Sequence, residues 1–431
     1  MSNIKQIFAH LKQDPMVSAV SMIGTALSIF LIMVVVAIQQ VKTAPFPPES
    51  NRGRMMYNSS MILKGISGEY KGSWTMSGLS AYAINELYKP LKTPECLTMY
   101  THWNDDVQVT VGDMPSVKCK TKSTDVNFWR VFNFKFIQGK PYDSAMLASQ
   151  RKVVVIEEWL AKKYYGGTNA VGKEIIINNF PYTVVGVVKN SSALATQAYA
   201  NVWSPYTAKQ AELDNEYGAA SLLEGPFTIG ILAHSSKDFA AIHKEADARL
   251  AVFNKSLVHT GYQIELFGRP FKQSQEIYAI NTNRPIDFRA IHRKQLIIII
   301  ILLLVPAINL SSMTHSRLRR RMAEIGIRRA FGSTRGEMLI QIVNENLAIT
   351  IVAGIIGWLL SVVFVYFGMD MLVSTTFNMF SGTVKVFDIV HFSTFLIALL
   401  FCFILNLIST LVPAWRASKI NIVNAIGGNN R

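Results

Sequence analysis

The 431-residue chain is 50% hydrophobic and only 16% charged, and its mean hydropathy of +0.24 indicates a membrane protein. A formal net charge of +15 is typical of proteins that bind nucleic acid or anionic lipid. The charge is accompanied by four long apolar segments and by no nucleic-acid-binding motif, so the sequence argues against nucleic-acid binding.

The first long apolar segment follows a short polar lead that contains Lys5 and Lys12. Residues 16–38 carry no charge over 23 positions, which is enough to cross about 30 Å of hydrocarbon. A cleaved signal peptide is the alternative, but its apolar core is normally about 7–15 residues long and ends at small residues. We therefore predict a retained transmembrane helix.

A large polar region, 43–290, begins with the stiff sequence Pro45-Phe-Pro-Pro48. Its strand and helix patterns alternate, which favours an α+β domain of two sub-lobes, with a hairpin turn at Asn178-Asn179. Strands are predicted at 55–63, 96–101, 107–111, 153–156, 174–177, 182–188, 227–233 and 262–267, and helices at 78–88, 157–165 and 237–253.

Three further apolar segments, 295–313, 338–367 and 392–413, complete the predicted set of transmembrane helices. The predicted fold is an integral membrane protein with four transmembrane α-helices and a large α+β extracytoplasmic domain inserted between helices 1 and 2. Its predicted parts are a lead and first helix (1–42), the extracytoplasmic domain (43–290) and a membrane domain (291–431).

The loop 317–337 between the second and third spans carries seven arginines against two acids, so the positive-inside rule predicts that it is cytoplasmic. A short helix is expected there, ended by Gly332 and followed by a capping box of Thr334 and Glu337. Ile325 lies on its polar face and suggests docking onto another protein, whereas the alternative is an anchor that only sets topology. The apolar face comprises Ala323, Ile327, Ala330 and Phe331.

The sequence of this loop from Arg320 to Thr334, followed by Gln341 and Glu345, resembles the signature of FtsX-type ABC permeases. The resemblance implies that the loop is the coupling helix that rests on an ATP-binding subunit. The residues it assigns to this contact are Arg320, Arg321, Glu324, Ile325, Gly326, Ile327, Arg328, Arg329, Ala330, Phe331 and Gly332.

Segments 126–139, 151–167, 171–188 and 202–205 resemble the periplasmic core domain of MacB-like permeases. We expect a permease subunit of the inner (plasma) membrane without a fused ATPase domain. The resemblance implies three partners: a separate ATP-binding subunit, a second permease chain (identical or related) and a periplasmic adaptor. ATP hydrolysis by the partner would move the exported domain, for export or mechanotransmission. The alternative is a membrane-anchored receptor or scaffold that senses a ligand with this domain.

Catalytic, cofactor and metal motifs are absent from the sequence, so we expect neither an enzyme nor a bound cofactor or metal. Residues 167–173 have the spacing of a phosphate-binding loop, but Glu174 stands where Ser or Thr should follow. Glu345, at the start of the third span, is expected to be functional or paired, unless it lies at the interface. Cys96 and Cys119 could form a disulfide in the exported domain, and free thiols are the alternative.

Overall fold

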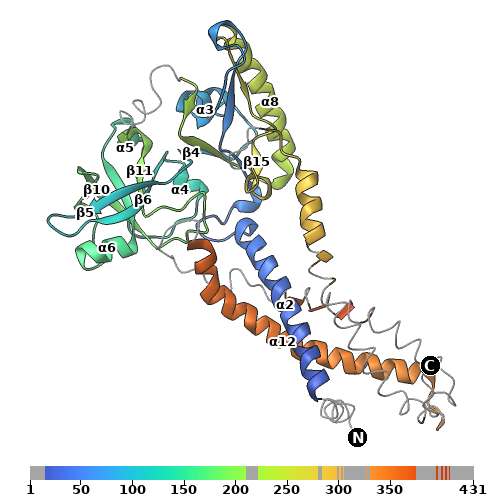
Figure 1. Cartoon of the computed structure of the whole chain (residues 1–431). Helices are drawn as coiled ribbons and strands as arrows, with labels where there is room; N and C mark the ends of the chain where they lie inside the picture. The colour runs from blue at the N-terminus through green and yellow to red at the C-terminus, as the bar shows by residue number, and fades with distance from the viewer. Residues whose placement is uncertain are drawn as a thin grey trace. The chain divides into compact units, whose positions relative to one another are not determined.

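The computed structural model describes residues 15–209, 222–279, 284–298 and 331–374, with positions 300, 301, 304, 327 and a few between 395 and 407. The chain divides into two compact units (Figure 1). One unit comprises residues 1–40, 289–376 and 385–431, and the other comprises residues 41–288 and 377–384.

The first unit contains two long apolar helices, α2 (Pro15–Thr43) and α12 (Arg335–Ser374). They pack closely: a Cβ on Gly357 of α12 would lie only 2.5 Å from the carbonyl oxygen of Ala26, so glycine is required there. The rings of Phe30 and Phe364 meet edge to face at 5.7 Å. The contact face of α2 repeats at helical spacing and contains the buried residues Ala26, Ile29, Met33 and Ala37.

Among the described residues, one helical stretch is long and apolar enough to span a membrane: Thr350–Phe367 of α12, with a mean hydropathy of 2.3. Met22–Ala37 of α2 is a shorter apolar segment inside the predicted first span. The predicted spans 295–313 and 392–413 lie largely outside the described residues. The number of four spans therefore stays a prediction.

The second unit is α+β. Its strands are β1 (Met55–Asn58), β2 (Met61–Gly65), β3 (Trp74–Leu79), β4 (Cys96–Thr101), β5 (Asp105–Thr110), β6 (Val117–Thr124), β7 (Phe136–Gly139), β8 (Val153–Glu157), β9 (Glu174–Ile177), β10 (Phe180–Val188), β11 (Val202–Pro205), β12 (Glu224–Gly225), β13 (Phe227–Leu232), β14 (Tyr262–Glu265) and β15 (Phe271–Lys272). Its α-helices are α3 (Ala81–Leu87), α4 (Phe128–Val131), α5 (Ser144–Ala148), α6 (Glu158–Tyr165), α8 (Phe239–Ser256) and α9 (Gln273–Glu276). Short 3₁₀ turns are η1 (Arg52–Arg54), η2 (Gly68–Tyr70), η3 (Tyr206–Lys209), η4 (Ser236–Asp238) and η5 (Val258–Thr260).

The strands form two lobes that share a continuous path of pairing (Figure 1). In the first lobe, strands β11, β8, β10, β9, β5 and β6 follow one another, and β11 also pairs with β6, so the six strands close into a barrel. Valines and isoleucines of these strands fill its core, together with Leu160, Ala161 and Tyr164 of α6. The barrel lobe thereby has its own hydrophobic core.

The second lobe continues the path through β4, β13, β3, β2 and β14, with β1 beside β13. Helices α3 and α8 cover it, and their apolar residues join those of the strands in one core cluster. A third cluster lies around the bulky aromatic side chains Tyr57, Tyr100, Phe128 and Trp203, which are all fully buried.

Most predicted elements of this unit are present, and the Asn178-Asn179 hairpin is confirmed. Both asparagines have positive φ (46° and 70°), and Phe180 pairs with Ile177 on either side of the turn. The single strand predicted at 55–63 is wrong, because the chain breaks at Ser59-Ser60 into β1 and β2.

The disulfide between Cys96 and Cys119 is not formed: both are free, buried thiols in different core clusters. Their strands β4 and β6 are antiparallel and pair Tyr100 with Thr124. The two cysteines lie on opposite sides of that pair, four and five residues away, so they are about 30 Å apart at 3.3 Å per residue. This distance is far beyond the reach of a disulfide.

Candidate functional site

Residues 41–288 of the α+β unit are joined to the first unit at both ends, and the segments near these two ends pair with each other. The first follows α2, and the second follows β14. Strands β1 and β15 pair antiparallel, with Met56 opposite Lys272 and Tyr57 opposite Phe271. We call segments 44–58 and 269–279 together the stem.

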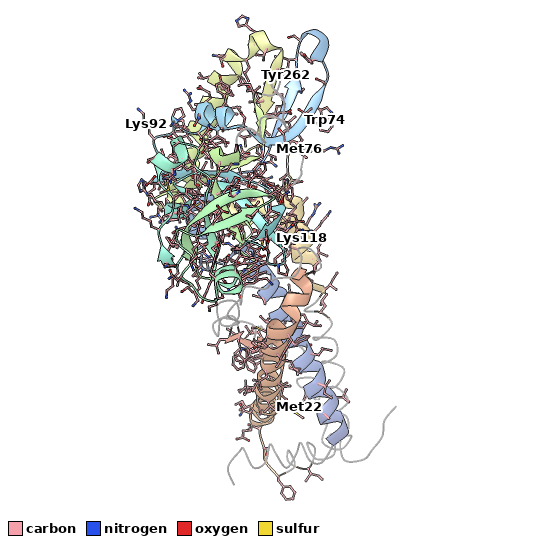
Figure 2. All side chains as sticks on the ribbon, turned by 90° about the vertical axis from the view of Figure 1, so that its left-hand side faces the viewer. Met22, Trp74, Met76, Lys92, Lys118 and Tyr262 are labelled. Atoms are coloured by element: carbon pink, nitrogen blue, oxygen red, sulfur yellow. The ribbon has the colours of Figure 1, made fainter. Side chains whose placement is uncertain are left out.

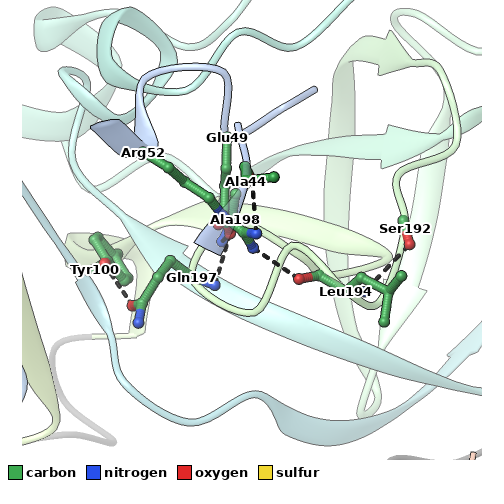
Figure 3. A network of polar contacts seen from close by, with 8 residues as sticks. All are labelled: Ala44, Glu49, Arg52, Tyr100, Ser192, Leu194, Gln197 and Ala198. Atoms are coloured by element: carbon green, nitrogen blue, oxygen red, sulfur yellow. Dashed lines mark hydrogen bonds and ion pairs between the residues drawn. The ribbon is translucent and has the colours of Figure 1, made fainter. Parts of the chain in front are cut away.

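A buried ion pair anchors the first segment of the stem (Figure 3). Arg52 Nε donates to Glu49 Oε2 at 2.6 Å, and both side chains are 1% exposed. The other carboxylate oxygen accepts hydrogen bonds from the backbone N–H groups of Gln197 and Ala198, at 2.8 and 2.9 Å. Because such a pair is costly to bury, its carboxylate oxygens and guanidinium need this full set of partners.

The guanidinium of Arg52 also ties the stem to its surroundings. Its two terminal nitrogens donate to the carbonyl oxygens of Ala44 (3.1 Å) and Leu194 (2.8 Å), as Figure 3 shows. Its carbon lies 4.3 Å from the ring centroid of Phe46. Since α2 ends at Thr43, the first residue of this anchor, Ala44, directly follows that helix.

The loop 189–201, which receives these bonds, is also held from the barrel side. Glu157, at the end of β8, accepts from the backbone N–H and the hydroxyl of Ser191, both at 2.8 Å, and from Asn201 Nδ2 at 3.0 Å. Burial raises the pKa of Glu157. Two buried acids, Glu49 and Glu157, therefore hold this loop between the stem and the barrel.

A second polar group anchors the returning segment of the stem. Ser59 donates to Glu276 Oε1, and Arg269 donates to the carbonyl oxygen of Ala279 at 2.9 Å. Burial raises the pKa of Glu276 to about 7. Among the described residues, Glu276 Oε2 and the Tyr57 hydroxyl are buried without a hydrogen-bond partner.

A buried lysine lies beside the path between the two lobes. Lys122 of β6 is fully buried, and its ammonium donates to the carbonyl oxygen of Thr101 at 3.0 Å. It lies 5.2 Å from the ring centroid of Tyr100, whose hydroxyl donates to Gln197 at 2.8 Å. Burial lowers the pKa of Lys122 to about 7. The polar network of the stem thus reaches the strands that join the lobes.

The predicted coupling stretch is described only at its end. Ile327 and Phe331, one helical turn apart, are exposed in the chain (48% and 89%). Gly332 has φ +99°, and Thr334 and Glu337 exchange backbone-to-side-chain hydrogen bonds, so the predicted helix end and capping box are confirmed. The remaining assigned residues lie outside the described residues: Arg320, Arg321, Glu324, Ile325, Gly326, Arg328, Arg329 and Ala330.

For two other predicted features, the structure shows the element in which each one lies. Glu345 lies in α12, and the position of its side chain is outside what is described. Residues 167–173 form the turn between α6 and β9, and Lys173 Nζ lies 5.1 Å from the ring centroid of Tyr165.

The stem residues were not predicted from the sequence. Glu49 and Arg52 lie in or just after a proline-rich segment, which predicts an exposed chain leaving the first span. Arg269 and Glu276 belong to no sequence pattern that predicts burial. The one available signal was the concentration of proline before Glu49, which marks a chain path with little freedom.

Comparisons with known proteins identify the family. The model of the MacB-like periplasmic core domain matches residues 18–249, more than half of the chain, and the FtsX-like permease C-terminal model matches residues 296–422. The chain belongs to the MacB-like ABC transporter permeases. Members of this family are membrane proteins with a large extracytoplasmic domain.

Two curated relatives of this permease differ in how much of their length it covers. It is 22% identical to YknZ of Bacillus subtilis, an uncharacterized ABC transporter permease, over 99% of this chain and 98% of YknZ. It is 24% identical to the macrolide export ATP-binding/permease protein MacB of Burkholderia cenocepacia, over 70% of this chain. The chain spans about 40% of the length of the MacB relatives that it matches.

Solved structures of similar proteins include the periplasmic region of MacB from Actinobacillus actinomycetemcomitans and the extracellular domain of YknZ. The first is 17% identical and covers 52% of this chain and 94% of its own, with a TM-score of 0.33. The second is 14% identical and covers 48% and 99%, also with a TM-score of 0.33.

Proposed function

We propose that this permease is the membrane subunit of an ABC system in which a separate ATPase drives movement of the extracytoplasmic domain. Its four spans lie in the inner membrane, and the domain is inserted between the first and second. A second permease chain, identical or related, completes the membrane part, with a periplasmic adaptor as an additional partner. The movement serves export or mechanotransmission.

The observation that carries this proposal is the paired stem. A flexible linker would absorb a displacement of the spans, whereas here the anchor begins one residue after α2 ends. The β1–β15 pairing ties the outgoing connection to the returning one, and the Glu49–Arg52 pair ties the outgoing one to the loop before β11. A displacement of either connection is thereby delivered to both lobes.

The predicted coupling stretch supports the second part of the proposal, which is the contact with the ATPase. Ile327 and Phe331 are large apolar side chains left exposed by this chain, and burying each in a partner is worth about 1.5–3 kcal/mol. The arginine-rich sequence around them gives the same helix a charged surface. Such a helix suits a groove on an ATPase subunit.

The experiment is co-purification with the ATPase, followed by ATP turnover of the reconstituted complex. Ile325→Asp and Glu324→Arg should each release the ATPase or uncouple its turnover, because a charge buried in the interface remains unpaired. The matched control is Lys118→Glu in the extracytoplasmic domain, which should leave the ATPase bound. If both loop variants bind and turn over as the wild type does, the loop only sets topology. If the wild type binds no ATPase at all, a receptor or scaffold is the better description.

A further inference from the structure

A pocket of about 230 Å³ lies in the second lobe of the α+β unit, beside the connection from β4 to β5. Its lining comes from the β1–β2 corner, from β3 and β12, and from the residues that follow β4. It is lined by Ser59, Ser60, Met76, Ser77, Gly78, His102, Trp103, Gly225 and Pro226.

The pocket lining carries no charge. Burial, with the nearby cations Lys122 and Arg269, lowers the pKa of His102 to about 4, so its imidazole is neutral at pH 7. His102 Nδ1 is 2.9 Å from the hydroxyl of Thr228, and its ring lies edge-on to Trp103 at 4.5 Å. Because an ionic ligand would lose its hydration without gaining a counter-charge, the pocket suits a neutral molecule.

The lining combines hydroxyls with one accessible aromatic face. Ser59, Ser60 and Ser77 supply three hydroxyl groups. Those of Ser59 and Ser77 already donate, to Glu276 and to the carbonyl oxygen of Gly78, so toward a ligand they act as acceptors, whereas Ser60 can donate and accept. Trp103 lines the pocket and is 53% exposed, so part of its indole is accessible to a ligand. The volume is below the about 300–1,000 Å³ of drug-sized sites, so the ligand is a single small ring or the end of a longer chain.

We propose that this pocket binds a neutral saccharide ring. A sugar has an apolar face of C–H groups for Trp103 and a rim of hydroxyls for the three serines. A peptide added as an extra strand fits less well, because the lining residues of β3 are already paired: Ser77 with Met61 and Gly78 with Gly225.

The site also contacts the stem. Ser59 lines the pocket, and its hydroxyl donates to Glu276 of the returning segment. A bound sugar that engages the β1–β2 corner therefore stabilises the arrangement of the stem. This consequence rests on the proposed function, whereas sugar binding does not.

The test is saturation-transfer NMR on the full chain in lipid nanodiscs, titrated with glucose, N-acetylglucosamine and an N-acetylglucosamine tetrasaccharide. Trp103→Ala should weaken binding by about tenfold or more. Trp74→Ala is the matched control, since Trp74 is 56% exposed and lies outside the pocket on the β2–β3 arm, where it projects beside Met76 (Figure 2). Melting temperatures of both variants should equal that of the wild type.

The saccharides also distinguish the source of the ligand. If the tetrasaccharide binds more tightly than the monosaccharides, the ligand is the end of a glycan chain. If all three bind equally, the ligand is a free sugar. Absence of transfer to all three saccharides in the wild-type chain overturns the proposal, as does equal loss in the two tryptophan variants. Because none of these measurements uses ATP, their failure is distinct from failure of the proposed coupling to an ATPase.

Discussion

Removing the charge of Glu49 should destabilise the α+β unit strongly. Glu49→Gln keeps an oxygen that accepts from Gln197 and Ala198 but leaves the buried Arg52 without its carboxylate. Removing one partner of a buried ion pair costs about 3–5 kcal/mol. For a unit of this size, each kcal/mol lowers the melting temperature by about 2–4 °C, so we expect a fall of roughly 6–20 °C.

The assay follows the unfolding of the detergent-solubilised full chain by the reaction of its thiols with a fluorogenic reagent. Cys96 and Cys119 are buried, and burial raises the pKa of Cys119 to about 12, so these thiols react only after unfolding. The third cysteine, Cys402, lies in the predicted span 392–413 and is replaced by Ala in every variant, so that the signal reports the α+β unit.

Two variants isolate the cause of the effect. Glu158→Gln removes the acid of a partly exposed pair with Lys162, which is worth less than about 1 kcal/mol. The double variant Glu49→Leu/Arg52→Met removes both buried charges and should recover much of the lost stability. The reasoning is refuted if Glu49→Gln melts no lower than Glu158→Gln.

Three further predictions concern pH, nucleotide and topology. Burial raises the pKa of Glu276 from 4.5 to about 7, so its contribution to stability is present at low pH and is lost as pH rises through about 7. Glu276→Gln should therefore melt higher than the wild type near pH 8 but not near pH 5. The same difference in melting temperature at both pH values would disprove this. Lys173→Ala should leave ATP turnover of the reconstituted complex unchanged, whereas a loss of ATP binding with the fold intact would show that the turn 167–173 binds phosphate. A cysteine at exposed Asn179 should be labelled from outside intact cells and one at Ser333 should not, and the reverse pattern would invert the proposed topology.

Local sequence signals predicted the local features well. Each of these features depends on residues that are close in the chain: the β-branched runs of β8 and β10, the Asn178-Asn179 turn, and the capping box of Thr334 and Glu337. These features follow from backbone preferences and short-range hydrogen bonds, which a sequence displays directly. The coupling residues from Arg320 to Ala330 were also predicted by pattern, and they stay a prediction.

The stem could not be predicted, because its contacts join residues far apart in the chain. Arg52 reaches the carbonyl oxygen of Leu194, and Ser59 reaches Glu276. The burial of Lys122 in strand β6 could not be predicted for a related reason: the strand's sequence alternates lysine with cysteine, threonine and serine, which is typical of an exposed strand. Charged residues read as exposed unless tertiary partners are known, and those partners are set by the fold.

The most direct test of the stem mechanism is to lock its two segments together. Met56 and Lys272 are directly opposite in the β1–β15 pair, so their Cβ atoms lie at a spacing that a disulfide can bridge. The double variant Met56→Cys/Lys272→Cys, with the natural cysteines removed, is reconstituted with the ATPase. Movement of the extracytoplasmic domains is measured as the distance between two fluorophores, one on each permease chain. Each fluorophore is attached at position 179 through a keto amino acid. If the stem moves as one body, oxidised and reduced samples will show the same ATP-driven change in distance. If oxidation stops that change while ATP turnover continues, the two segments must separate during the cycle and the account is wrong.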